Sequence, residues 1–557
     1  IDSLIYYEKP FLTFERLLET YLGVAPRGSR SFISAMQVWI KEKLFLKYEL
    51  QKQFNILQKE LNPEEKVIVP KCLFSEHHQA HAGAAFYPSP YKNAAVLCMD
   101  GVGEWATTSA WIGKDNKLKP LWEISFPHSL GLLYSSFTYY CGFKVNSGEY
   151  KLMGLAPYGK PIYAEIIKEK LIDIKNDGSF RLDMSYFNYM TGLTMINKKF
   201  EKLFGEPARK AEIDKITQFH MDIAASIQIV LEIVINKITK HTAEQYNIKN
   251  LCLAGGVALN CVANGKILKS KSFENIWVQP AAGDAGGALG AALSIWYSML
   301  GNARVTNNNS DNMKGSYLGP EFSSDEIESS LINLGAKFKK FDMKTIIEMT
   351  SESLSEGKAV GWFQGRMEFG PRALGNRSIL ADPRNIDMQK NLNLKIKYRE
   401  SFRPFAPSIL KEDVSEWFDT VYESPYMLFV SDVKKEKILV SKEEIEETGF
   451  DRLNRALSVV PAITHVDFSA RVQTVDEHSN GLYYSLIKKF KEKTECPILI
   501  NTSFNVRGEP IVLSPEHAFR CFMGTELDVL VCGQFIMYKN DQHISEISDY
   551  KDLYQPD

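Results

Sequence analysis

The chain has 557 residues, of which 45% are hydrophobic and 24% are charged, and its formal net charge is −2. This length and composition are typical of a globular protein with two to four domains. The near-zero net charge gives no indication of a nucleic-acid-binding surface. The eight cysteines lie mostly inside apolar runs, and none of them forms a C-x-x-C pair. No apolar run reaches the roughly 18 residues that a membrane-spanning helix needs, and no signal-peptide pattern is present. We therefore expect a cytoplasmic protein.

The first 60 residues mix apolar and basic residues at helical spacing, most clearly over 32–56, and carry no chemical motif. We therefore predict a helical insertion over about residues 10–60.

Histidines cluster in the next stretch. Three of the ten histidines, His77, His78 and His81, fall within five positions. On a helix, His77 and His81 are one turn apart and project from the same face, where they can share a metal ion, while His78 points elsewhere.

An apolar run over 94–99 has the length of a buried strand and ends in Asp100. Because α/β folds bind ligands at the carboxyl ends of buried strands, Asp100 is a candidate third ligand. Two imidazoles and a carboxylate suit a divalent ion such as Fe, Zn or Mn. The alternative is a surface helix with ordinary histidines, followed by an Asp-Gly turn.

The segment 121–158 contains a predicted turn over 126–131 before an aromatic helix. Glu149 and Lys151 follow it and precede a glycine loop. These two residues are candidates to contact a nucleotide phosphate or a metal-bound water. An ordinary surface ion pair is the alternative.

A helix is predicted over 220–246, packed on the sheet, with His220 in a structural role. Residues 250–260 then form a strand, a glycine turn and a helix start, where backbone N–H groups can bind phosphate. Gly255, Gly256 and Asn260 are the candidates. The run 276–288 repeats this design and offers Asp284 as a fourth metal ligand or as a helix N-cap.

Residues 303–323 are rich in Asn and poor in apolar residues, so we predict a surface linker and a domain boundary there. Helices are expected over 324–334 and 343–357, and a strand over 359–363.

The run 364–378 carries three arginines, Arg366, Arg372 and Arg377, among glycines and a proline. A rigid loop with guanidinium groups suits an oxyanion, because the planar fork binds such groups bidentately. Further basic residues follow at Lys395, Lys397, Arg399, Arg403 and Arg471, and Asn501 is expected at the end of an apolar strand. For a basic run in isolation, the alternative is a solvated surface.

The chain resembles the O-carbamoyltransferases, which modify nodulation factors, aminoglycosides and cephem antibiotics. The resemblance covers nearly the whole chain, and it is carried by the following motifs: H-H-Q-A-H (77–81), V-L-C-M-D-G (96–101), G-E-Y-K-L-M-G-L-A-P-Y-G (148–159), L-A-G-G-V-A-L-N (253–260) and A-A-G-D-A-G-G-A (281–288).

The resemblance implies an α/β protein of two domains. Residues 1–302 would form an actin-like domain similar to the universal tRNA threonylcarbamoyl-transfer protein, and 324–545 a YrdC-like domain followed by a tail over 546–557. Position by position, Arg372, Lys397, Arg403, Arg471 and Asn501 would bind carbamoyl phosphate, with Lys397 and Arg403 also acting in catalysis. Asp183 would lie near the acceptor site as a further catalytic residue.

The implied reaction activates carbamoyl phosphate with ATP and Mg²⁺ as a carbamoyl-adenylate. A site built from His77, His81, Asp100 and Asp284, with Fe²⁺ or another divalent ion, then serves transfer to a hydroxyl of a sugar or secondary metabolite. The alternatives are a tRNA-modifying or hydrogenase-maturation-like enzyme and an inactive nucleotide-binding protein. Family members begin with a strand pair that supplies an acid and a histidine as the base, so we expect this chain, which starts at Ile1, to transfer poorly by itself.

Overall fold

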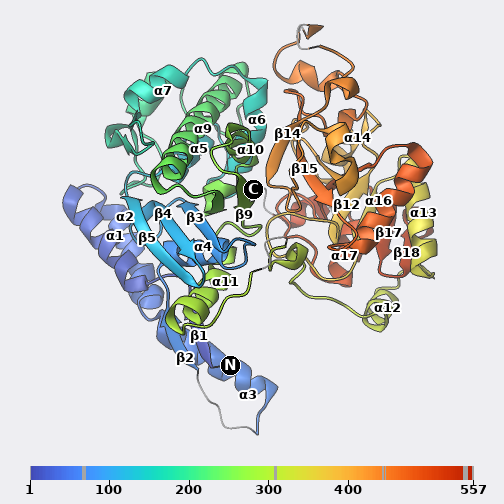
Figure 1. The fold of residues 1–557 in the computed structure, drawn as a ribbon, viewed down its shortest axis with the longest axis horizontal. Coiled ribbons are helices and arrows are strands. Elements are labelled where there is room, and N and C mark those ends of the chain that lie inside the picture. The colour runs from blue at the N-terminus through green and yellow to red at the C-terminus, as the bar shows by residue number, and fades with distance from the viewer. Residues whose placement is uncertain are drawn as a thin grey trace.

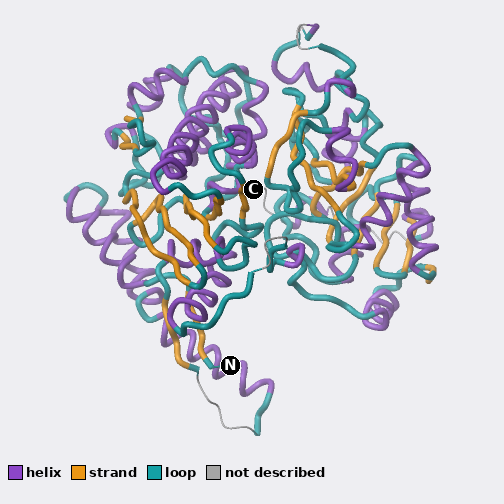
Figure 2. The backbone as a smooth tube through the Cα atoms, viewed as in Figure 1, coloured by secondary structure: helices purple, strands orange, loops and turns teal. Residues whose placement is uncertain are grey.

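A computed structural model of the chain describes residues 2–64, 70–306, 310–441, 444–445, 447–542 and 550–554. Figure 1 shows two halves side by side, each built around its own β-sheet, with the residues before about 300 on the left and the later ones on the right. Figure 2 shows helices packed around the strands of both halves. The predicted α/β class is confirmed.

The sheet of the first half has five strands, and parallel and antiparallel pairing both occur in it. Its order is β5 (Lys117–Ser125), β4 (Ala106–Lys114), β3 (Asn93–Met99), β8 (Asn250–Ala254) and β9 (Asn275–Val278). Strands β3, β8 and β9 run parallel, with Cys98 paired to Ala254. Since the carboxyl ends of parallel strands meet at one edge, Asp100 and the turn at Gly255 lie side by side.

Two small sheets accompany it, a parallel pair and an antiparallel pair. They are β1 (Ser3–Tyr6) with β2 (Lys71–Phe74), and β6 (Ile172–Ile174) with β7 (Phe180–Leu182). The helices of the first half are α1 (Pro10–Val24), α2 (Ser29–Val38), α3 (Leu46–Leu61), α4 (His77–Phe86), α5 (Leu130–Tyr140), α6 (Glu149–Leu155), α7 (Ala164–Lys170), α8 (Lys198–Phe204), α9 (Gln218–Tyr246), α10 (Cys261–Ser270) and α11 (Ala285–Ser294).

The second half is built on a mixed sheet of nine strands. Its order is β10 (Lys339–Lys340), β18 (Phe535–Tyr538), β17 (Val529–Cys532), β11 (Val360–Phe363), β12 (Arg377–Ala381), β16 (Ile498–Ser503), β13 (Ala406–Leu410), β15 (Ser469–Val475) and β14 (Phe429–Asp432). The helices around it are α12 (Ser324–Asn333), α13 (Met343–Ser355), α14 (Met388–Asn391), α15 (Val414–Trp417), α16 (Gly481–Thr494) and α17 (Pro515–Met523).

Most predicted elements are confirmed. Helices α12 and α13 and strand β11 occupy the expected positions, and α1, α2 and α3 fill the predicted helical insertion. Helix α9 also forms as expected, and its apolar residues share one hydrophobic core with strands β3 and β8. His220 is structural, because its ring completes a capping box with Thr217 at the start of α9.

The segment 303–323 was predicted to be a surface linker, but some of its side chains are buried or bonded to the rest of the fold. Residues 307–309 lie outside the described part of the chain. Arg304 donates hydrogen bonds to the carbonyls of Phe86, Tyr87 and Ser89, and Asp311 accepts from Trp277 and Tyr426. Met313 is 1% exposed. The polar composition of the segment gives no sign of these few side chains. They attach the segment to both halves, because Trp277 belongs to the first half and Tyr426 to the second.

The predicted tail over 546–557 lies mostly outside the described residues. Its described part, 550–554, packs back on the second half, where Tyr550 is buried against Gly524 and its hydroxyl donates to Glu509.

The two halves share apolar contacts as well as hydrogen bonds. The hydrophobic core around β3 and β8 extends to Phe402, Ala406 and residues 426–429 of the second half. The Tyr158 hydroxyl donates to the Phe402 carbonyl over 2.9 Å, and Asn264 Nδ2 donates to the Leu428 carbonyl over 3.0 Å.

All eight cysteines are buried and free. Within the part of the chain that the structure describes, none of the helices has both the length and the apolar character needed to cross a bilayer.

Helices α4 and α11 approach each other closely because glycines face the contact. A Cβ at Gly290 would overlap the carbonyl oxygen of Ala80, and a Cβ at Gly83 would lie 2.6 Å from the Gly290 carbonyl oxygen. Small residues at these positions therefore set the spacing between the two helices.

We expect Gly290→Ala to lower the free energy of unfolding by about 1–3 kcal/mol or more, since the added methyl must push α4 and α11 apart. Thermal and urea unfolding measure the effect. Gly23→Ala is the matched control, because a Cβ there meets nothing within 4 Å. Equal stability of the Gly290→Ala variant and the wild-type chain would contradict this account of the packing.

Candidate functional site

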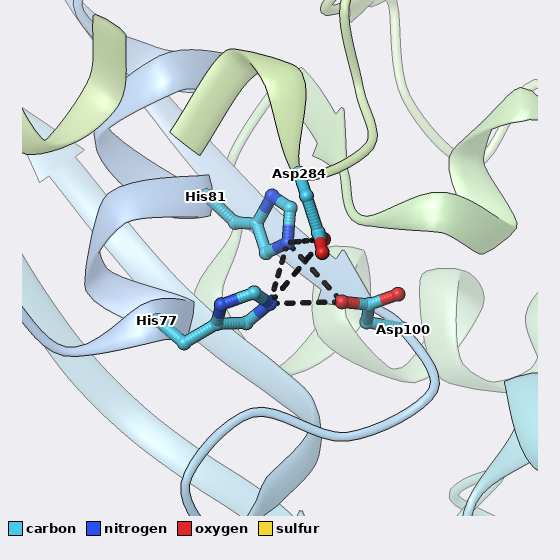
Figure 3. A group of neighbouring side chains, drawn as sticks. All are labelled: His77, His81, Asp100 and Asp284. Carbon is cyan, nitrogen blue, oxygen red and sulfur yellow. Dashed lines mark hydrogen bonds and ion pairs between the residues drawn. The ribbon is translucent and has the colours of Figure 1, made fainter. Parts of the chain in front are cut away.

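The two histidines that share a helix face lie on α4, whose first residue is His77. Both are buried, with His77 5% and His81 1% exposed. Their Nε2 atoms lie 3.1 Å apart, and both point away from the helix axis toward the same place (Figure 3). His78 points elsewhere, as predicted, with its Nδ1 2.7 Å from Ser109 Oγ.

Two carboxylates complete this group. Asp100 follows β3, and its Oδ2 lies 3.0 Å from His77 Nε2 and 3.2 Å from His81 Nε2. Asp284 precedes α11, and its Oδ1 lies 3.6 and 3.7 Å from the same two nitrogens. Figure 3 shows the four side chains converging from these segments. One ligand atom from each lies within 4.8 Å of the others. Asp284 makes no side-chain cap on α11, although it occupies the N-cap position.

These spacings fit a transition-metal ion. Bonds of about 2.0–2.2 Å to nitrogen and oxygen place neighbouring ligand atoms about 3.0–3.5 Å apart, close to the separations here. The donor set of two imidazoles and two carboxylates suits Fe, Zn or Mn better than Ca.

The group also stabilises positive charge. Burial by itself would lower the pKa of His81, but the hydrogen bonds and charges of Asp100 and Asp284 outweigh it and raise that pKa to about 9. Burial would likewise raise the pKa of Asp100, yet the bonds from His77 and His81 hold it well below its usual range. A buried position that favours a charged imidazole is one where a cation is favoured.

One residue that the sequence analysis missed supports the histidine helix. Glu104 is 7% exposed, and its carboxylate accepts from the backbone N–H groups of His77 at 3.0 Å and Lys9 at 2.8 Å. It therefore satisfies the amino end of α4 from outside the helix. No local spacing signals such a contact across 27 residues.

The glycine turn lies directly beside the His/Asp group. Gly255 has φ +87°, and a Cβ there would overlap the Met99 carbonyl, so this position favours glycine. The Gly256 N–H donates to Asp100 Oδ1 over 3.3 Å.

Asn260, a predicted nucleotide contact, has a structural role. Its Oδ1 accepts from the Ala263 N–H at the start of α10, and its Nδ2 donates to Gln228. Its polar groups are occupied within the fold, and a contact between Asn260 and a nucleotide stays a prediction.

The surface-pair alternative for Glu149 and Lys151 is also wrong. Lys151 is 1% exposed, and its Nζ lies 3.7 Å from Glu400 Oε1 of the second half. Glu149 accepts from Ser135 and from the backbone N–H of Asn146. Helix α6 therefore directs the buried ammonium group of Lys151 toward the second half.

Glu400 lies among cations from both halves. Arg507 reaches the same oxygen at 3.4 Å, and Arg403 lies 3.9 Å from the other, Oε2, which is buried without a hydrogen-bond partner. Burial would raise the pKa of Glu400, but the charges of Lys151 and Arg507 outweigh it and lower that pKa.

Arginines gather on the second half facing α6. We call Arg372, Arg399, Arg403 and Arg471 the arginine cluster. Burial, with the charge of Arg471 next, lowers the pKa of Arg372 to about 9. Burial, and then Arg403, holds the pKa of Arg399 well below its usual range. The Arg403 guanidinium lies 4.5 Å from the ring centre of Tyr150 on α6.

Like charges held this closely favour an anion between them. Arg372 Nε is buried with no hydrogen-bond partner, so at least one donor of the cluster is available to a ligand.

The loop that carries Arg372 is held by a buried carboxylate. Glu368 is 5% exposed, and its Oε1 accepts from the backbone N–H groups of Leu374 and Asn376 at 2.7 and 2.8 Å. Arg377, expected to face an oxyanion, begins β12 instead and donates to the carbonyls of Gln364 and Gly365. Of the three arginines in this run, Arg372 alone joins the cluster; Arg366 is exposed and near Glu321.

The expectation that Lys397 binds substrate is not supported by its geometry. Its Nζ lies within 3.3 Å of four acceptors, which are the carbonyls and side chains of Ser503 and Asn505, and the residue is 3% exposed. An ammonium has three N–H donors, so these acceptors occupy them. Burial, followed by Arg399, also holds the pKa of Lys397 well below its usual range.

Asn501 lies within β16, where an end position was expected, and it is 1% exposed. Its Nδ2 donates to Ala373 O, Ser408 Oγ and Gln473 Oε1, while its Oδ1 is buried without a partner.

Asp183 lies apart from both groups on an exposed turn, where it accepts from the Ser185 N–H. It is connected to the edge that carries Asp100, however. The Leu182 N–H donates to His128 Nδ1, and the adjacent Ser129 hydroxyl donates to the Asp100 carbonyl.

Two family models match this chain. The model described as the carbamoyltransferase N-terminus matches residues 1–293, and the model of the carbamoyltransferase C-terminus matches residues 351–539.

Three relatives illustrate the similarity. Uncharacterized protein sll1178 of Synechocystis is 57% identical over 97% of this chain and 88% of its own length. Nodulation protein NolNO of Sinorhizobium fredii is 37% identical over 91% of this chain and 68% of its own. The 3'-hydroxymethylcephem-O-carbamoyltransferase of Streptomyces clavuligerus is 32% identical over 51% of this chain and 47% of its own.

If the His/Asp group holds a metal, His81→Ala should reduce the bound metal to well below one equivalent, because it removes a ligand from the centre of the group. Elemental analysis of the purified protein measures this. His78→Asn is the matched control, since His78 lies on the same turn but bonds to Ser109. Equal metal content in the His81→Ala variant and in the wild-type chain, with both folded, would rule out the assignment.

Proposed function

Since the chain belongs to the O-carbamoyltransferase family and is an enzyme that transfers carbamoyl groups, we propose that it activates carbamoyl phosphate with ATP as a carbamoyl-adenylate and passes the carbamoyl group to a hydroxyl of a sugar or secondary metabolite. The observation that carries this proposal is the pairing of two sites of opposite character. A cation-favouring His/Asp group lies on the first half, and an anion-favouring arginine cluster lies on the second.

The arginine cluster suits the first step. Arg372, Arg403 and Arg471 would hold the phosphate of carbamoyl phosphate, with Arg399 as a further cation beside them. Hydrolysis of carbamoyl phosphate releases inorganic phosphate and leaves carbamate. A carbamate oxygen then attacks the α-phosphorus of ATP, and the bond to the β-phosphate breaks. One water is consumed, and pyrophosphate leaves with Mg²⁺, while the arginines offset the negative charge that develops.

The first half suits the second step. The acceptor oxygen attacks the carbamoyl carbon, the bond from that carbon to the AMP oxygen breaks, and the hydroxyl proton must be removed. Asp183 is our candidate near the acceptor, because the contacts through Leu182 and His128 connect its turn to the edge that carries Asp100. A divalent ion held by His77, His81, Asp100 and Asp284 would supply Lewis-acid and orienting chemistry here.

The backbone near Gly255 and Gly256 is our candidate for nucleotide contact, since its N–H groups lie beside Asp100. Lys151 stands at the boundary between the two sites, where Glu400 holds it. We propose that Glu149 supports α6 from within the first half, through its bonds to Ser135 and Asn146.

We also assign residues 1–302 to an actin-like domain and residues 324–545 to a YrdC-like domain, with 303–323 between them. The two family models, over 1–293 and 351–539, fall inside these bounds and support the division.

The arginine cluster can be tested through pyrophosphate release. In each of Arg372→Ala and Arg403→Ala, the loss of a charge-assisted bond to the anion, about 1.5–3 kcal/mol, should raise the KM for carbamoyl phosphate by roughly tenfold to a hundredfold. The assay measures AMP and pyrophosphate formed from ATP as carbamoyl phosphate is varied.

Arg366→Ala is the matched control, because Arg366 belongs to the same loop but is exposed. Elemental analysis should show the same metal content in all three variants. A KM for carbamoyl phosphate that is unchanged in both cluster variants would place the donor site elsewhere.

A further inference from the structure

Helices α1, α2 and α3 form an insertion that contributes to neither hydrophobic core. Within the described part of the chain, the buried residues of the two cores begin at Ala82 and at Ile327, so none of them lies in these helices. Figure 1 shows the three helices at the periphery of the first half. Short helices are marginally stable in water by themselves, and an amphipathic helix is normally covered along its apolar face. The apolar side chains of the insertion are therefore expected to be covered by one another or by a partner.

Helix α2 packs on α1 through aromatic side chains. The ring centres of Phe32 and Tyr21 lie 5.1 Å apart, and those of Trp39 and Phe14 lie 5.9 Å apart. Phe32 and Trp39 are separated by about two helical turns, so they mark one face of the helix. This face is covered from within the chain.

A second row of apolar side chains, one position after each of these aromatic residues, is open to solvent. Ile33 and Ile40 are 60% and 53% exposed. Phe45 and Tyr48, at the start of α3, are 58% and 66% exposed. Large apolar side chains that are exposed together, and not singly, mark a surface that binds a partner.

The same segment is strongly basic. Residues 27–48 contain five basic residues and one acidic residue, so their net charge is +4, whereas that of the whole chain is −2. The basic residues are Arg27, Arg30, Lys41, Lys43 and Lys47. All five are exposed. Lysine and arginine beside exposed aliphatic and aromatic side chains are typical of a helix that lies in the headgroup region of an anionic bilayer.

The charge favours a lipid surface over a second copy of the chain. In a two-fold dimer the same surface would meet itself, so its basic residues would face one another. Lysine is also depleted in protein–protein interfaces relative to the rest of the surface. An anionic bilayer instead offers an apolar phase for side chains such as Phe45 and the opposite charge for the lysines.

We propose that α2 and the start of α3 form a peripheral binding site for an anionic phospholipid bilayer. Ile33, Ile40, Phe45 and Tyr48 enter the headgroup region, and the five basic residues contact the anionic lipid headgroups. A site of this kind lies on the bilayer surface and needs no spanning helix. The inference is independent of the proposed function, because none of these residues belongs to the His/Asp group or to the arginine cluster.

Flotation of the full chain with lipid vesicles tests the inference. The vesicles contain phosphatidylcholine alone, or phosphatidylcholine with one third phosphatidylserine. The wild-type chain should prefer the second kind, and its binding should weaken as NaCl is added. Each basic residue near an anionic bilayer strengthens binding roughly fivefold, so the triple variant Lys41→Gln, Lys43→Gln, Lys47→Gln should bind about a hundredfold more weakly. Phe45→Ser should weaken binding about tenfold, because it removes an apolar side chain that leaves water.

The matched control is the triple variant Lys344→Gln, Lys390→Gln, Lys435→Gln, because these lysines are also exposed but belong to the second half. Circular dichroism checks that each variant is folded, and the comparison of the two vesicle types requires no variant. Equal binding by the two triple variants would overturn the inference. So would wild-type binding that is absent or is the same for both vesicle types. A wild-type dimer in light scattering that Ile40→Glu separates into monomers, without vesicle binding, would assign the surface to a second copy instead.

Discussion

The close contact between α4 and α11 is the constraint on which the His/Asp group depends. Glycines at 83 and 290 let the two helix backbones approach, and larger side chains there would overlap the facing carbonyls. One helix carries His77 and His81, and the other begins after Asp284, so their spacing sets whether the ligand atoms lie within reach of one ion. The position of Asp100 is determined by a different element, because this residue follows the buried strand β3 at the edge of the sheet. Three segments distant in sequence thereby meet at one point.

The boundary between the halves is equally specific. Helix α6 begins in the first half but presents Tyr150 and Lys151 to Arg403 and Glu400 of the second. A buried lysine and a cluster of arginines would repel one another without Glu400, which offsets part of the charge. The remaining excess of positive charge suits phosphate groups, and it lies beside the half that carries the His/Asp group. In the reaction that we propose, the two stages would use sites on different halves, with α6 at the boundary between these halves.

Much of this could be predicted from the sequence, for identifiable reasons. The i, i+4 spacing of His77 and His81 and the strand-end position of Asp100 follow from helix and strand periodicity alone, and the glycine turn at 255–256 follows from its composition. Residues engaged in long-range hydrogen bonds could not be predicted. Lys397, Arg377 and Asn260 have the residue types of a binding site, but backbone carbonyls and neighbouring amides occupy them. Glu104, Glu400 and Gln473 were missed for the same reason, since their partners lie far away in sequence. The contacts of Arg304 and Asp311 could not be predicted, because both residues lie within an Asn-rich segment that is typical of a surface linker.

The most direct test of the two-site account is to compare both steps in one preparation before and after removal of the metal with a chelator. Labelled carbamoyl phosphate and ATP would be supplied with a panel of sugars and polyols, and pyrophosphate release and labelled carbamoyl product would be measured together. The account predicts that pyrophosphate release dependent on carbamoyl phosphate persists in the metal-free protein, while carbamoyl transfer is lost and returns when the metal is restored. Loss of both steps together, or transfer that continues without metal, would contradict it.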